Sequence, residues 1–141
     1  IRDLVIADGG STDATRRIAD AVGAEAVEGP ADRDALVRLG VAQAKGAWVL
    51  ALVPGTRLGE GWADLVGDHM RGRRGVACCR LVQRGGGAAV RLACLGANLR
   101  TRLSGGANVR QGLLAPRRDC SAGRVRLLDV ALYTAGLTDD L

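Results

Sequence analysis

A carboxylate followed by two glycines stands out near the start of the chain, in the stretch LVIADGGSTDAT at residues 4–15. Asp8 ends an apolar run, and its carboxylate can accept hydrogen bonds from a base N–H or a ribose hydroxyl. Gly9 and Gly10 permit positive φ and allow a ligand to approach the backbone. Ser11 opens a group of small polar residues, and the N-terminus of the helix that follows favours anions. The stretch therefore suits a nucleotide. It contains neither the P-loop nor the GxGxxG motif, and an ordinary strand–turn–helix joint is the alternative.

The elements that must position these residues begin with a strand and a helix. The apolar run at residues 4–7 predicts a strand buried on both faces. Ser11, Thr12 and Asp13 are residue types that prefer the N-cap, and the spacing of apolar residues after them predicts a helix that ends at Gly23. The conspicuous acid thus lies between a strand and a helix.

The rest of the chain continues this alternation. The patterns predict strands at 24–27, 47–53, 75–82 and 108–115, and helices at 35–44, 61–72, 88–103 and 125–135. Strands that alternate with helices predict an α/β fold with a mostly parallel, Rossmann-like sheet flanked by helices. Composition does not mark a second domain, so we expect a single domain over 1–141. Ligands bind at the carboxyl ends of strands in such sheets, where Asp8 and Gly55 both lie.

Charge and cysteine content limit the possible binding partners and the cellular compartment of the protein. The 141 residues have a formal net charge of +5, and almost every cation is arginine, because Lys45 is the only lysine. Arginine binds phosphates well, so the possible partners are nucleotides, nucleic acid and the surface of an anionic membrane, with which the chain would associate peripherally. The alternative is a genome-wide preference for arginine that implies no partner. The interleaved aromatic residues of nucleic-acid readers are missing, so we expect no nucleic acid. Four cysteines without a CxxC pair predict free thiols, no zinc site and a reducing, cytoplasmic location.

Four segments resemble the family 2 glycosyltransferases, which have the GT-A fold and use nucleotide sugars. VIADGGSTDAT resembles the family's DGGSTDGT segment, and RLGVAQAKGAWVLALVPGTRL resembles NAGxxxAxGDxLLFLHADTRL. LGANLRTRLSGGANVRQGLLAPR is similar to the NxRSRxxGxxxGDQGLFVRR run of one bacterial branch, and RLLDVAL to PLMEDVDL. The segments occur in the family's order and cover most of the chain. The family's first strand precedes the first segment, so the resemblance implies a chain truncated at its N-terminus.

The resemblance implies a set of site residues and a reaction. A sugar would pass from a nucleoside diphosphate donor to an acceptor hydroxyl, with inversion at the sugar carbon, and the acceptor itself stays unknown. Asp8 would lie near the base, Arg33 near the diphosphate, and Asp129 would be the general base toward the acceptor. The nucleotide-binding residues implied by the matching segments are Asp8, Gly9, Gly10, Ser11, Asp13, Arg33, Arg110 and Gln111.

Departures from the family's pattern fall on its most reactive positions. The family's carboxylates at the end of the third strand hold Mg²⁺ or Mn²⁺, which offsets charge on the leaving diphosphate. Here those positions are Val53, Pro54 and Gly55, none of which can ligate a metal. Arg110 replaces the acid of the GDQG-like run, and a guanidinium there would partly replace the metal, although a plain surface arginine is the alternative.

Two functions therefore compete. One is a glycosyltransferase-like domain whose transfer reaction is weakened or lost, because electrostatic stabilisation of the leaving group is usually a large part of catalysis. The other is a non-catalytic nucleotide-binding or structural domain with a degenerate active site. In that second case Asp129 is an exposed residue of an amphipathic helix. A basic nucleic-acid-binding module is a third and weaker alternative.

Overall fold

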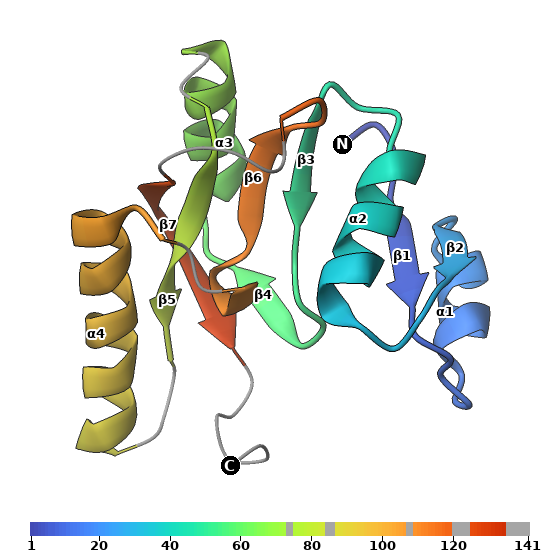
Figure 1. The fold of residues 1–141 in the computed structure, drawn as a ribbon, viewed down its shortest axis with the longest axis horizontal. Coiled ribbons are helices and arrows are strands. Elements are labelled where there is room, and N and C mark those ends of the chain that lie inside the picture. Colours follow the sequence, from blue (N-terminus) through green and yellow to red (C-terminus); the bar gives the residue numbers. More distant parts are fainter. Residues whose placement is uncertain (73–74, 84–86, 107–108, 120–124, 135–141) are drawn as a thin grey trace. The chain divides into compact units, whose positions relative to one another are not determined.

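Strands and helices follow one another along the chain in the computed structural model, which describes residues 1–72, 75–83, 87–106, 109–119 and 125–134 (Figure 1). Contacts divide the chain into two compact units, Ile1–Val49 and Leu50–Leu141. The single domain over 1–141 stays a prediction. No helix in these described ranges is long and apolar enough to cross a membrane.

The first unit is a strand–helix–strand–helix arrangement (Figure 1). Strands β1 (Val5–Asp8) and β2 (Glu25–Glu28) pair in parallel, and helix α1 (Thr15–Ala21) connects them. Helix α2 (Arg33–Gln43) packs against β1, and the Asp32 carboxylate caps it by accepting from the Ala35 N–H at 2.8 Å. The predicted elements of this region are thereby confirmed to within a few residues, but β1 is not buried on both faces, because Val5, Ile6 and Ala7 are only half-buried.

The second unit is built on a five-stranded sheet with the order β3-β6-β5-β7-β4. Its elements are β3 (Trp48–Ala51), β4 (Thr56–Leu58), α3 (Trp62–Arg71), β5 (Ala77–Val82), α4 (Ala88–Ser104), the 3₁₀ turn Val109–Gln111, β6 (Leu113–Pro116) and β7 (Arg126–Thr134). Helix α4 packs on β5 and β7, whereas α3 packs on β7.

This sheet is mixed, which corrects the expectation of a mostly parallel sheet. Strands β5 and β7 run parallel, but β4 is antiparallel to β7 and β6 is antiparallel to β5. The prediction assumed a helical crossover between successive strands. A tight turn at Pro54 and Gly55 instead links β3 directly to β4, and the short strand β4 was not predicted at all.

The predicted helix at 125–135 was wrong, because Arg126–Thr134 forms strand β7. Its run of leucine, valine and alanine fits a buried strand as well as a helix, since a short apolar stretch carries no decisive period. Pairing decides the outcome, because β7 lies between β5 and β4 in the sheet. There Val130 and Leu132 are 1% and 0% exposed, so the strand is part of the core.

A buried polar network joins α4 to the sheet beneath it. The Asn98 Oδ1 accepts from the Leu81 N–H, and its Nδ2 donates to the Leu81 carbonyl, both at 3.0 Å. Asn98 therefore satisfies both backbone hydrogen-bonding groups of Leu81 on β5. Gln111 Nε2 donates to Asn98 Oδ1 at 3.3 Å, and Thr101 Oγ1 donates to Gln111 Oε1 at 2.9 Å. Satisfied networks of this kind favour one arrangement of a core.

The cysteines within the described residues are buried free thiols. Cys78 and Cys79 on β5 are fully buried, and Cys94 faces inward from α4. Burial raises the pKa of the Cys78 thiol to about 12 and that of Cys79 to about 11. These thiols are therefore protonated core residues at neutral pH. The fourth cysteine of the sequence, Cys120, lies outside the described residues.

Candidate functional site

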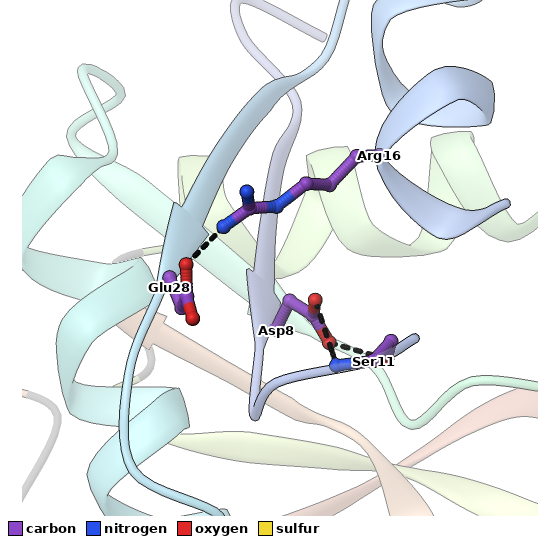
Figure 2. Close-up of polar contacts among 4 residues, drawn as sticks. All are labelled: Asp8, Ser11, Arg16 and Glu28. Carbon is purple, nitrogen blue, oxygen red and sulfur yellow. Dashed lines mark hydrogen bonds and ion pairs between the residues drawn. The ribbon is translucent and has the colours of Figure 1, made fainter. Parts of the chain in front are cut away.

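The turn after β1 is organised by a carboxylate and a serine (Figure 2). Both carboxylate oxygens of Asp8 accept from the Ser11 N–H at 3.1 Å, and the Ser11 hydroxyl donates to Oδ1 at 2.5 Å. This closes the chain into a turn across Gly9 and Gly10. Ser11 therefore bonds back to Asp8 rather than capping the helix as the sequence predicted.

The charge state of Asp8 follows from the same contacts. Asp8 is only 7% exposed, yet the hydrogen bond from the Ser11 hydroxyl lowers the pKa of its carboxyl below the ordinary value of 3.8. The Arg16 guanidinium, which pairs with Glu28 on the neighbouring strand, lowers it further (Figure 2). Asp8 is therefore ionised at neutral pH and can act only as an acceptor. A carboxylate has about four acceptor directions, so lone pairs remain for a ligand.

The two glycines of this turn are needed for different reasons, one for its backbone conformation and one for the space beside it. Gly10 has φ +98°, a conformation that residues with a side chain rarely adopt, as the sequence predicted. A Cβ on Gly9 would lie 3.2 Å from the Ala31 Cα, so Gly9 lets the loop before α2 approach the turn. The close approach seen at Gly9 is thus made by the chain itself.

Asp13 and Arg33 lie at the starts of the two helices in this unit. Asp13 accepts from the Thr15 N–H at 2.9 Å and from the Thr15 hydroxyl, and these bonds lower the pKa of its carboxyl. It therefore closes a short side-chain turn just before α1, whose N-cap residue is Ala14. Arg33 is the exposed first residue of α2, where a cation opposes the helix dipole. The structure thus collects the predicted residues Asp8, Gly9, Gly10, Ser11, Asp13 and Arg33 in the first unit.

The positions at which the resemblance places metal ligands form a closed turn. The Val53 carbonyl accepts from the Thr56 N–H at 3.3 Å and from the Thr56 hydroxyl at 2.6 Å. Pro54 and Gly55, the latter with φ +77°, occupy the corners as in a type II turn. No side chain here is a carboxylate. Within the described ranges, no three His, Cys, Asp or Glu side chains gather in a way that could hold a metal ion. The residues present do not fit the Mg²⁺ or Mn²⁺ of the family.

Asp129 lies at an irregularity in β7. Leu128 is opposite Cys79 on β5 and Ala131 is opposite Arg80, so Asp129 and Val130 fall between two registers. Such a β-bulge redirects side chains and is frequent next to active sites. Here it turns Val130 into the core and leaves the Asp129 side chain 82% exposed. The Arg80 Nε donates to the Asp129 carboxylate at 2.9 Å.

A pocket of about 600 Å³ opens beside Asp129 between α3 and β7. Its polar walls include the Asp68–Arg71 ion pair of α3. Arg126 of β7 also lines it and makes no ion pair within the described residues. The pocket therefore combines an exposed carboxylate with a guanidinium available to an anion. The residues that line it are Leu65, Asp68, His69, Arg71, Gly72, Arg126, Leu128 and Asp129.

Sequence reasoning missed this pocket because its walls come from elements distant in sequence. It also missed Arg80, for which one signal existed: a single arginine inside the apolar run VACCRLV. A charge within a strand usually has a partner, and here that partner is Asp129 across the sheet.

Gln111 and Arg110 differ in burial although they are adjacent. Gln111 is 0% exposed, and its amide belongs to the network with Asn98 and Thr101. Arg110 is half-buried on the 3₁₀ turn. Of this predicted pair, only Arg110 leaves part of its surface open to a ligand.

Comparison with solved structures decides the fold. The chain superposes on glucosyl-3-phosphoglycerate synthase from Mycobacterium tuberculosis, crystallised with phosphoglyceric acid, with a TM-score of 0.58 and 22% sequence identity. The match covers 84% of this chain and 47% of that one. The chain has a glycosyltransferase-like fold. No protein-family model matches the chain, and no curated protein sequence matches it either.

The candidate residues of the Asp8 turn and Asp129 both lie on elements of this glycosyltransferase-like fold. The Asp8 turn follows a strand of a parallel pair, and Asp129 lies on a central strand of the mixed sheet. The chain spans about half the length of the synthase it resembles. The Rossmann-like α/β character expected from the sequence is thereby confirmed, while the parallel sheet is not.

Proposed function

We propose that the chain is a glycosyltransferase-like domain that binds a nucleoside diphosphate sugar without a divalent metal and transfers the sugar weakly or not at all. One observation carries the proposal: a glycosyltransferase-like fold holds an ionised Asp8 at the end of β1 while a closed turn occupies the place of the metal ligands. Because fold alone does not determine function, these residues carry the assignment.

Donor binding is assigned to the turn after β1. The Ser11 contacts hold the Asp8 carboxylate in place, and its remaining lone pairs accept from a base N–H or a ribose hydroxyl. Arg33 supplies a guanidinium toward the diphosphate, with Arg110 as a second candidate. Gly10 and Asp13 contribute by shaping the turn and the start of α1.

Transfer is assigned to Asp129. Its carboxylate would take the proton of the acceptor hydroxyl as that oxygen bonds to the sugar carbon and the bond to the diphosphate oxygen breaks, with inversion. The hydrogen bond from Arg80 holds the Asp129 carboxylate at the wall of the pocket. Arg126 on the same pocket favours an acceptor that bears a carboxylate or a phosphate. Charge on the leaving diphosphate is then offset only by arginines, so we expect slow transfer.

A non-catalytic domain that only binds the nucleotide is the alternative, and the Val53–Thr56 hydrogen bonds favour it, because they fill the place of the metal ligands with a closed turn. A nucleic-acid-binding module draws on net charge alone and is not favoured. We also assign the domain to the cytoplasm, which is consistent with free Cys78, Cys79 and Cys94.

Calorimetric titration of the chain with UDP and with GDP tests the proposal, each with Mn²⁺ or with EDTA. We expect equal affinity in both conditions and a loss of binding in Asp8→Asn. Asp20→Asn, which removes an exposed carboxylate from α1, should bind like the unchanged chain. Binding that requires Mn²⁺ would overturn metal independence, and absence of binding by a folded chain would overturn donor recognition.

Release of labelled sugar to phosphoglyceric acid and to neutral glycerol separates the catalytic from the non-catalytic form. Slow transfer that disappears in Asp129→Asn, at unchanged nucleotide affinity, supports the general base. Transfer that survives in Asp129→Asn contradicts that role. A preference for the anionic acceptor should fall in Arg126→Gln and stay in Arg17→Gln, which changes an exposed arginine of α1.

A further inference from the structure

Helix α4 presents a row of exposed leucines on the side away from the sheet. Cys94, Asn98 and Thr101 face the core, and the helix packs on β5 and β7. On the other side Leu92, Leu95, Leu99 and Leu103 are 67%, 63%, 57% and 70% exposed. At about 100° per residue, these four leucines fall within an arc of roughly 80° along the helix. Contiguous exposed apolar side chains of this kind mark a surface that another body covers.

Arginines flank this leucine stripe, defined as Leu92, Leu95, Leu99 and Leu103. Arg91 and Arg102 lie along one side of the stripe and Arg100 along the other, as the helical spacing requires. All three are exposed, and none forms an ion pair within the described ranges. The helix Ala88–Ser104 contains no acidic residue. Its outer surface is therefore apolar along the middle and positive at both edges.

We infer that the leucine stripe of α4 binds an anionic lipid surface, with the helix lying in the plane of the interface. An amphipathic helix with leucines on one face and arginines beside them inserts its apolar face among the acyl chains while the guanidinium groups reach lipid phosphates. The membrane is favoured over a second copy of the chain by charge. Two α4 helices placed face to face would bring six arginines together with no acid on either helix to pair with them.

This contact goes beyond sugar transfer and does not depend on it. The leucine stripe belongs to α4, whereas the pocket with Asp129 is lined by α3 and β7. A domain held at a bilayer by α4 would meet acceptors carried by lipids as well as dissolved ones. Loss of lipid binding would therefore leave nucleotide binding intact, and the reverse also holds.

Vesicle flotation of the full chain tests the inference, with phosphatidylcholine vesicles and with vesicles that contain roughly one third phosphatidylglycerol. We expect the chain to float with the anionic vesicles. With the neutral vesicles it should stay unbound at the bottom of the gradient. The double variant Leu95→Gln/Leu99→Gln should lower the partition coefficient roughly a hundredfold, since two leucines no longer enter the apolar layer. Because both leucines are exposed, we expect the variant to fold, and circular dichroism checks this.

A matched control exists on α1 and its end, where Ile18 and Val22 are 59% and 60% exposed and also four residues apart. Ile18→Gln/Val22→Gln should float like the unchanged chain. Equal loss in both double variants, or no flotation at all, overturns the inference. Sedimentation-velocity analysis adds a second test. If the chain forms a dimer that Leu95→Gln/Leu99→Gln dissociates, and does not bind lipid, the leucine stripe binds a second copy of the chain instead.

Discussion

Replacing Asn98 by leucine tests the packing that supports the sheet beneath α4. Asn98 makes two 3.0 Å hydrogen bonds with the Leu81 backbone and accepts a longer one, of 3.3 Å, from Gln111. Leucine has the same branching and the same number of side-chain heavy atoms but a larger volume, so Asn98→Leu removes the polar contacts without a cavity and adds some crowding. The variant therefore measures the cost of losing the polar bridge between α4 and β5, together with this crowding.

The expected loss follows from the groups left without partners. Leu81 is 8% exposed, so water cannot readily replace Asn98 at its N–H and carbonyl. An unsatisfied buried group costs about 1–3 kcal/mol, and two such groups together cost about 2–6 kcal/mol. Because domains are stable by only about 5–15 kcal/mol, this change removes a large part of the free energy of unfolding. Gln111 loses its contact with Asn98 but keeps that with Thr101.

Urea unfolding followed by circular dichroism measures this difference. We expect the midpoint to fall while the slope with urea concentration stays constant. Arg100→Leu, two residues along the same helix and exposed, is the control and should change the free energy of unfolding by less than about 0.5 kcal/mol. A loss below about 1 kcal/mol in Asn98→Leu would refute the reasoning, because the network would then contribute no more than one ordinary hydrogen bond.

Three further outcomes follow from the described contacts. NMR titration should place the pKa of Asp8 below 3.8, and Ser11→Ala should raise it. Because folding lowers the pKa of Asp8, the ionised Asp8 carboxylate stabilises the folded state. This stabilisation is complete above the pKa of the unfolded chain and is lost as the pH falls through the pKa of the folded chain. Ser11→Ala should therefore lessen the loss of stability in acid. Cys78 and Cys79 should resist alkylation at about pH 8 until urea unfolds the chain, as mass spectrometry of their peptide would reveal; labelling of the folded chain contradicts their burial. Gly55→Ala should destabilise the chain by about 1–2 kcal/mol in urea titrations, since φ is +77° there, and an unchanged midpoint would argue against the turn.

The local signals in the sequence predicted the first unit well. The apolar run before Asp8 and the small polar residues after it define β1, the turn and α1, and all of these interactions are near in sequence. What Ser11 and Asp13 bond to was less predictable, because either can cap a helix or close a turn. Here Ser11 closes the turn after β1, and Asp13 bonds to Thr15 from one residue before the N-cap, Ala14.

The second unit depended on pairing between distant residues, which no local pattern reveals. Arg126–Thr134 has apolar content that suits either a helix or a strand, and its neighbours β5 and β4 make it a strand. The bulge that exposes Asp129 exists only because two strands of unequal local length are paired. The role of Gln111 in the core was hidden for a similar reason, since Asn98 and Thr101 belong to another element.

The turn at Val53–Thr56 has a consequence for attempts to engineer a metal site into this domain. An acid placed at Gly55 would sit at φ +77°, and Pro54 would still fix the other corner of the turn. A single substitution therefore yields one strained carboxylate and no chelate, while it weakens a turn that now stabilises the link between β3 and β4. An acid introduced at Gly55 therefore loses stability before a metal centre can form. Building a metal site at this place would call for replacing the whole loop at once.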